Sequence, residues 1–142
     1  GPLDLYERPE TAFVAGFIGS PAMNFLEATF EAAESGMVCR LEQNVEVELT
    51  GRRPSQAAGA GSLGLRPEHV RFAETGLKAE VEFVENIGEA CLLHLATEAG
   101  VRVIARRPDD AGARVGDVVR IALDPEYCHA FDADGRALPR GR

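Results

Sequence analysis

The chain has 142 residues, of which 45% are hydrophobic and 27% charged, proportions that are ordinary for a globular domain. A chain of this length can bury about 70% of the surface that it exposes when unfolded, so it needs neither disulfides nor a metal to fold. The net charge of −8 divides evenly, with −4 in residues 1–71 and −4 in residues 72–142. Such evenly spread acidity argues against a basic face for nucleic acid.

The N-terminal stretch is predicted to hold a short helix. Pro9 suits a first helical turn, and Phe13, Phe17 and Ile18 follow at helical spacing on one apolar stripe. Pro21 forbids continuation. No apolar run approaches the roughly 20 residues that span a bilayer, so we expect a soluble protein.

From Met23 onward the pattern has the period of two that is typical of strands. In residues 77–83 we expect Phe83 on the inward face and Glu80 and Glu82 on the solvated face. Residues 52–62 are rich in Gly, Ala and Ser and indicate a loop. The predicted strands cover residues 23–30, 37–41, 45–49, 63–66, 77–83, 90–95, 101–104, 118–123 and 128–131. Eight or nine short strands indicate an all-β sandwich or barrel.

The chain offers little catalytic or metal-binding chemistry. Its three cysteines form no CxxC pair, which fits neither a disulfide framework nor a zinc site. Cys128 and His129 are strand neighbours that point to opposite faces, so they are poorly placed to hold one ion. The only lysine, Lys78, does not stand in the G-x-x-x-x-G-K-[ST] pattern that binds nucleotide phosphates. We therefore expect no catalytic residue, cofactor or metal in this chain.

Four stretches resemble one family of bacterial proteins in the order in which they occur. Residues 5–25 read LYERPETAFVAGFIGSPAMNF and resemble the pattern LYxRPxxxFVAxFIGSPxMNF. Residues 63–70 (LGLRPEHV) are similar to an LGIRPEH strand, residues 81–89 to a VEVVExLG strand and turn, and residues 128–132 to a closing HLFD element. The family is that of the ATP-binding proteins of carbohydrate importers of the ABC type, the maltose importer being typical. In members of that family, the corresponding stretches run from the end of the ATPase core through the C-terminal regulatory domain.

The resemblance implies a fold, a role and a set of partners. It implies an all-β assembly of the OB-fold, molybdate-binding (MOP-like) type with a short N-terminal helix, with residues 1–21 as the junction and 22–142 as the transport-associated OB (TOBE) regulatory domain. ATP and magnesium would bind in an ATPase core preceding this part. The expected partners are a second copy of the domain in a homodimer, the ATPase core of the same chain and, indirectly, the membrane subunits. The expected location is the cytoplasmic face of the bacterial membrane.

Two groups of residues are predicted to carry this role. The first would seat the domain on the ATPase core, or would simply pack on this chain's own barrel: Phe13, Phe17, Ile18, Met23, Asn24 and Phe25. The second would contact the twin domain or a partner, the alternatives being a tight hairpin and an ordinary exposed ion pair: Glu85, Asn86, Ile87, Gly88, Arg66 and Glu68.

Three functions compete at this stage. An interaction module that holds an ATPase dimer together comes first. A small-ligand or oxyanion sensor comes second, because such a site needs clustered donors and the only arginine pairs, Arg52-Arg53 and Arg106-Arg107, border predicted loops. An OB-fold nucleic-acid binder comes last, because it needs a basic groove with stacking aromatics and only 6% of the residues are aromatic.

Overall fold

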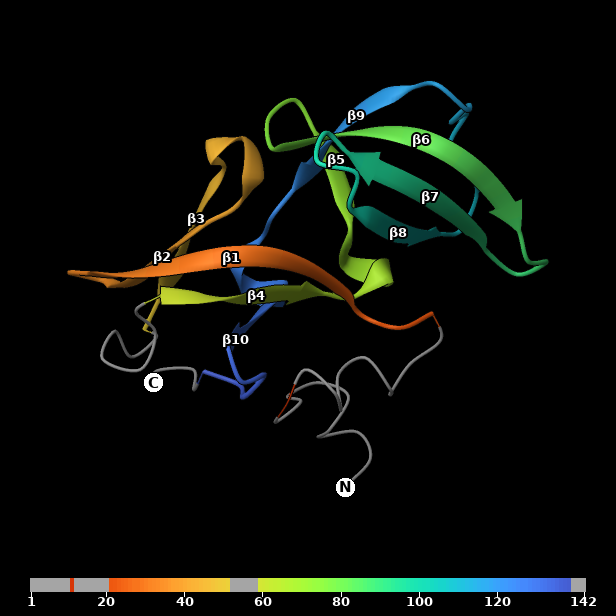
Figure 1. Ribbon diagram of the computed structural model, residues 1–142. Coiled ribbons are helices and arrows are strands. Elements are labelled where there is room, and N and C mark those ends of the chain that lie inside the picture. The colour runs from red at the N-terminus through yellow and green to blue at the C-terminus, as the bar shows by residue number, and fades with distance from the viewer. Residues whose placement is uncertain (1–10, 12–20, 52–58, 139–142) are drawn as a thin grey trace.

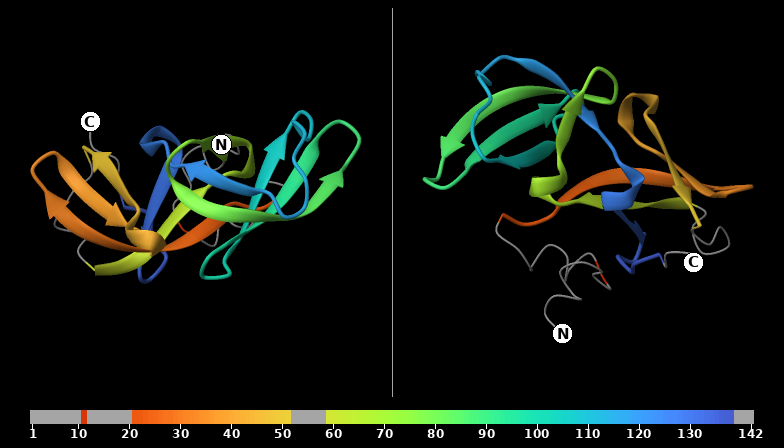
Figure 2. Two further views of the ribbon diagram at one scale, coloured as in Figure 1. Left: turned by 90° about the horizontal axis from the view of Figure 1, so that it is seen from above. Right: turned by 180° about the vertical axis from the view of Figure 1, so that it is seen from behind.

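The computed structural model describes residues 11, 21–51 and 59–138, and in this part of the chain ten strands form two antiparallel sheets. The first sheet has the strand order β10-β4-β1-β2-β3, and the second has the order β5-β9-β6-β7-β8. Figures 1 and 2 show the two sheets lying beside each other. The strands are β1 (Asn24–Ala33), β2 (Gly36–Arg40), β3 (Glu46–Thr50), β4 (Gly59–Leu65), β5 (Arg71–Ala73), β6 (Leu77–Asn86), β7 (Cys91–Thr97), β8 (Arg102–Arg107), β9 (Val118–Ala122) and β10 (Cys128–Asp132).

The predicted all-β class is confirmed, and every predicted strand has a counterpart. The alternation in β3 buries Val47 and Leu49 and exposes the residues between them, as expected for a strand with one solvated face. The strand that sequence patterning missed, β5, has only three residues. Its pairing with β9 establishes it, because three residues are too few to display a period.

The loop predicted over residues 52–62 is too long at its C-terminal end, because β4 begins at Gly59. Within β4, Gly61 lies against the backbone carbonyl of Phe131 and the ring of Phe30, and a Cβ at that position would collide with both. A strand glycine often marks such a close approach of backbone. The Gly-rich composition reflects tight packing at this point of β4.

The predicted N-terminal helix is not supported by the described residues. Most of its length lies outside them, and Thr11 forms an isolated antiparallel bridge with Arg136. Helical structure in the described part consists of short 3-10 turns, η1 (Glu42–Asn44), η3 (Pro67–His69) and η4 (Pro125–Tyr127). The predicted boundary between a junction segment and the domain at residue 22 stays a prediction.

The chain crosses between the sheets twice, and both crossings use the same kind of turn. It leaves the first sheet through η3 and returns through η4, each of which begins with a proline followed by a glutamate and a ring-bearing residue. The rings of His69 and Tyr127 stack with their centroids 4.1 Å apart and their planes 23° from parallel. The two crossings are therefore held against each other.

One hydrophobic core serves both sheets. Its fully buried members include Phe30 and Leu63 from the first sheet and Leu77, Leu95 and Ile121 from the second. Separation of the two sheets would expose this shared core. Such exposure is unfavourable, because burial of apolar surface stabilises a fold by about 25 cal/mol per Å². The two sheets therefore form one unit.

The side chain of Asn24, at the start of β1, pairs with the edge of the second sheet. Its Nδ2 donates to the Ile104 carbonyl at 2.9 Å, and its Oδ1 accepts from the Ile104 N–H at 2.8 Å. Strand β8 is an edge strand, and edge strands present unpaired backbone groups. Asn24 is only 8% exposed, so this amide stands in for a neighbouring strand at a buried position.

A second amide makes the same arrangement at the start of β6, a central strand of the second sheet. The Gln43 side chain donates to the Lys78 carbonyl at 2.9 Å and accepts from the Lys78 N–H at 2.8 Å. Gln43 has a φ of 63°, a left-handed conformation that costs a non-glycine residue about 1 kcal/mol. Next to it, Glu42 accepts from the Thr97 hydroxyl at 2.7 Å and from the Ala99 N–H at 3.1 Å. The turn η1 is thus bonded to β6, to the end of β7 and to the turn that follows β7.

The Asn24 contact can be tested by truncation. We expect Asn24→Ala to lower the free energy of unfolding by about 2 kcal/mol or more, because it strands both backbone groups of Ile104 at a buried position. Urea denaturation measures the difference. Glu27→Ala, an exposed change on the same strand, is the matched control and should stay within about 0.5 kcal/mol of the native chain. Equal stabilities of the two variants would contradict the assignment.

The stacked His69 should make stability depend on pH. Burial, first, and the neighbouring Arg71 and Arg66 lower the pKa of His69 below its ordinary value of 6.5, against the opposite influence of Glu68 and Glu126. The unfolded chain therefore binds a proton that the folded chain resists once the pH falls below about 6.5, so stability decreases from pH 7 toward pH 5.5. His69→Phe keeps a ring against Tyr127 and removes the titration. Its thermal midpoint should fall less over that interval, and an identical fall in both proteins would refute the prediction.

Candidate functional site

The structure describes three of the six residues predicted to form a junction, namely Met23, Asn24 and Phe25. The other three, Phe13, Phe17 and Ile18, lie outside the described residues. Met23 is buried beside Phe131 in a small cluster apart from the main core, and the ring of Phe25 meets that of Phe131 edge to face at 5.8 Å. Asn24 bonds to β8 as described above. Packing on this chain's own sheet is thus established for Met23 and Phe25, and contact with an ATPase core stays a prediction.

The predicted partner segment at residues 85–88 forms the tight turn between β6 and β7. Asn86 Oδ1 accepts from the Gly88 N–H at 2.9 Å, and the Ile87 N–H donates to the Ala90 carbonyl at 2.9 Å. Gly88 has a φ of 93°, which glycine adopts without strain. Glu85 Oε1 lies 3.0 Å from His94 Nε2. The turn leaves Ile87 39% exposed, so an apolar side chain stands at its tip.

The prediction that Phe83 faces inward is wrong, because a bulge interrupts β6. The pairing of β6 with β7 shifts between Val81 and Phe83, and a bulge of this kind moves the following side chains to the other face. Phe83 is therefore 54% exposed, while Val84 packs against the core. Strict alternation in the sequence gives no sign of the extra residue.

Exposed apolar side chains gather on the second sheet around this bulge. The bulge region of β6 bonds to the loop before β9, where Val81 exchanges backbone hydrogen bonds with Asp117 and Gly116 at 2.8 Å. Val115 and Val118 flank these two residues and are 67% and 57% exposed. We call Phe83, Val115 and Val118 the apolar edge. Its exposure in a strongly acidic chain marks a surface suited to a protein contact.

The predicted surface at Arg66 and Glu68 is divided by η3. Arg66 is 2% exposed, whereas Glu68 is exposed. Burial lowers the pKa of Arg66 from its ordinary value. The alternative of an exposed Arg66–Glu68 ion pair is therefore wrong, because the guanidinium lies inside the fold. Any partner contact here would have to be made by Glu68.

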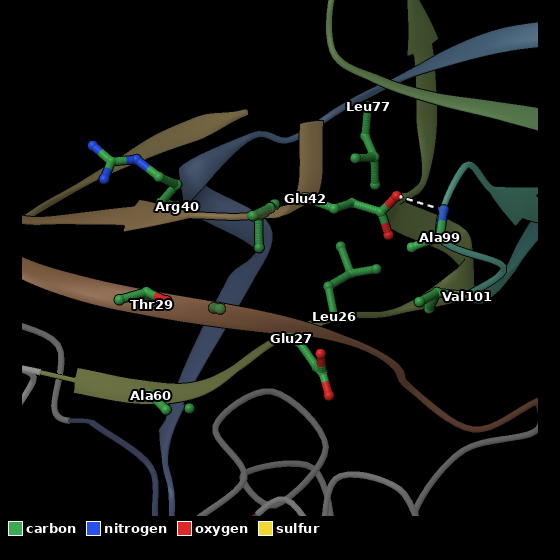
Figure 3. A pocket seen from close by; sticks show the side chains of 12 residues that line it. Leu26, Glu27, Thr29, Arg40, Glu42, Ala60, Leu77, Ala99 and Val101 are labelled. Atoms are coloured by element: carbon green, nitrogen blue, oxygen red, sulfur yellow. Dashed lines mark hydrogen bonds between the residues drawn. The ribbon is translucent and has the colours of Figure 1, made fainter. Parts of the chain in front are cut away.

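A groove of about 560 Å³ lies between β1, β4, η1, the start of β6 and the turn that follows β7. Figure 3 shows Leu26 and Leu77 facing each other across it, with Glu42 reaching toward Ala99. Two of its three charged groups already have partners: Glu42 accepts from Thr97 and Ala99, and Arg40 lies 2.6 Å from Glu46. The groove therefore offers few free polar groups with which to orient a ligand.

The cysteines behave as small apolar side chains. Cys39, Cys91 and Cys128 are free thiols and all buried. Burial raises the pKa of Cys39 to about 12 and raises that of Cys91 as well, so both remain protonated at neutral pH. Among the described residues, no three His, Cys, Asp or Glu side chains gather as metal ligands would. No helix in the described residues is long and apolar enough to cross a membrane.

Two families match consecutive parts of the chain. Residues 19–70 match the MalK OB fold domain, and residues 63–131 match the TOBE domain. The overlap falls on β4 and η3, where the chain leaves the first sheet for the second. The boundary between the two families thus coincides with the first crossing.

Similar proteins include ATP-binding subunits of importers. The sn-glycerol-3-phosphate import protein UgpC of Ruegeria sp. is 41% identical over 92% of this chain and 36% of its own length. The maltose/maltodextrin import protein MalK of Vibrio parahaemolyticus is 38% identical over 98% of this chain and 39% of its own length. The chain thus spans less than half the length of these relatives, and the matched part is the OB and TOBE region, not the ATPase core.

Among solved structures, the cytoplasmic molybdate-binding protein ModG has the same fold. The two align with a TM-score of 0.63 over 82% of this chain and 96% of ModG, at 14% identity. At that identity the likeness concerns the fold alone, and it agrees with the predicted OB, molybdate-binding type of barrel. Together the two matches cover residues 19–131, so the chain combines a MalK OB fold domain with a TOBE domain.

Proposed function

We propose that this chain is the regulatory and dimerisation domain of the ATP-binding subunit of an importer for sugars or glycerol phosphate. The observation that carries the proposal is that importer subunits match nearly the whole chain, while the chain spans only 36–39% of their length. The rest of such a subunit would contain the ATPase core, with its ATP and magnesium. The complete protein would work at the inner face of the bacterial membrane and reach the membrane subunits through that core.

The rigidity of the two-sheet unit suits it to this role. In the transport cycle two ATPase cores would close on ATP and separate again, so something else must keep the pair together. A unit whose sheets share one core and are joined through Asn24 and Gln43 can keep a constant interface while a hinge elsewhere absorbs the motion. The domain would then act by keeping the two ATP-binding subunits together, with no chemical step of its own.

The apolar edge is the surface that we propose for contact with a second copy. Phe83, Val115 and Val118 are among the large apolar side chains that the described residues expose, and with Ile87 all four belong to the second sheet or its loops. Apolar side chains of this kind form the centre of protein interfaces, where a few of them contribute most of the binding energy. The nearby carboxylates of Glu80 and Glu82 would form part of the polar rim.

Self-association of the chain tests this proposal. Sedimentation equilibrium from about 10 μM to about 1 mM, a range that covers weak association, should show a monomer–dimer equilibrium. Phe83→Ser and Val115→Ser should each weaken the dimer about tenfold or more, because each removes an apolar anchor. Glu48→Ser, an exposed change on β3 of the first sheet, should leave the equilibrium unchanged.

Two results would count against the proposal. The first is a native chain that remains monomeric throughout the range, and the second is tight binding of ATP by this chain in calorimetry. A thermal midpoint measured for each variant distinguishes lost contact from lost folding, and Val115, which lies in a loop and is 67% exposed, is the safer of the two substitutions.

A further inference from the structure

A second groove, of about 440 Å³, lies on the second sheet beside the apolar edge. Strand β6 contributes Lys78, Glu80 and Glu82 to its lining, and β9 contributes Val118. The two strands pair along one side of the sheet, where Figure 1 shows them next to each other. Because Val118 also belongs to the apolar edge, the groove and the edge form one continuous surface.

The register of β6 on β9 places the charges of this surface in rows. Lys78 lies directly opposite Arg120, and Glu80 lies directly opposite Val118. Glu82 follows at the bulge and lines the same groove. The alternate residues of a strand share a face, so the surface begins with a basic row, passes through Glu80 and Val118, and ends with an acidic group.

Contacts within the chain do not account for the basic row. Like charges directly opposite each other on neighbouring strands are destabilising. Lys78 Nζ lies 3.9 Å from Glu98 Oε1 and both side chains are exposed, so this ion pair contributes little. Arg120 donates only to the Gly76 carbonyl, at 3.5 Å, and no carboxylate of the described residues lies within 4 Å of it. Arg120 therefore keeps most of its donors available.

The other end of the surface carries groups that complement an arginine. Glu80 and Glu82 are exposed, and neither belongs to an ion pair in the described part of the chain. Phe83 stands next to them and is 54% exposed. Its ring is supported by that of His94, with 5.3 Å between the centroids. A carboxylate and an aromatic ring are both favourable partners for a guanidinium group.

We propose that two copies of the chain dock face to face through β6 and β9, with the strands antiparallel about a two-fold axis at Val118. This arrangement rests on the dimer proposed above and specifies its geometry. The basic row of each copy then lies against the acidic and aromatic end of the other, so Arg120 meets Glu82 and Phe83 of the second copy. A two-fold axis forms every such contact twice.

A second copy is the partner that this surface fits, because the surface is complementary to itself. Two chains of net charge −8 repel each other unless opposite charges meet where they touch. Reversal of the strand direction about Val118 supplies such a match at both ends, with apolar side chains between them. Apolar contact then provides affinity, and the charges fix the relative orientation.

Charge reversal tests this orientation. In sedimentation equilibrium, Arg120→Glu and Glu82→Arg should each weaken the dimer about tenfold or more, because each places like charges opposite one another across the interface. General repulsion between acidic chains predicts instead that Glu82→Arg tightens the dimer, since the chain becomes less acidic. Arg102→Glu, an exposed change on β8, alters the net charge as Arg120→Glu does and should weaken the dimer less than about twofold.

A mixture of the two weakened variants gives the sharper test. In a heterodimer of Arg120→Glu with Glu82→Arg, both two-fold contacts join opposite charges again. Native mass spectrometry of the equimolar mixture should therefore show mainly the heterodimer, while each variant alone is mainly monomeric. Thermal midpoints close to that of the native chain confirm that both variants fold.

The outcomes distinguish this arrangement from the dimer on which it rests. A native chain that stays monomeric contradicts the proposed function itself. A native dimer that Phe83→Ser weakens, but that neither Arg120→Glu nor Glu82→Arg weakens, retains the proposed function and overturns the two-fold arrangement at Val118. Failure of the two weakened variants to form a heterodimer overturns it as well.

Discussion

Two side-chain amides hold the two sheets in one relation to each other. Asn24 pairs with the backbone of Ile104 on β8, and Gln43 pairs with the backbone of Lys78 on β6. Each amide supplies both a donor and an acceptor, so it satisfies two backbone groups that no strand reaches at that point. A shorter or apolar side chain could fill the space but would leave those groups unpaired, at a cost comparable to a lost hydrogen bond for each. Hydrophobic contact alone could let the sheets slide, whereas these bonds fix their register.

The proposed contact surface depends on this fixed relation. The segment η3–β5 lies beside the end of β8, and β8 is the strand that Asn24 holds to the first sheet. The stacked rings of His69 and Tyr127 bring the two crossings together beneath Arg71. The apolar edge lies around the bulge of β6 and the start of β9. One rigid unit therefore carries the apolar edge in a fixed position on its second sheet.

The sequence predicted the strands well and the contacts between the sheets poorly. Alternation identified β3 and most of β6 because each buries one face, but it cannot reveal the bulge that exposes Phe83, since an inserted residue leaves the local pattern intact. The residues before Leu63 read as a loop because Gly61 is selected for close backbone approach and not for a buried side chain. Asn24 was singled out only by resemblance, and its bond to Ile104 joins residues 80 positions apart. The repeated Pro-Glu-ring turn at Pro67 and Pro125 was visible in the sequence, and it was the one signal that could have placed the two crossings together.

Amide hydrogen exchange at Ile104 and Lys78 tests the central claim most directly. These two N–H groups donate to side chains and not to a neighbouring strand, so their protection reports the amide contacts themselves. If the contacts lock the sheets together, both N–H groups should exchange as slowly as those of the buried strands, through global unfolding alone. Exchange at both sites through local opening, while the amides of β7 stay protected, would contradict the account.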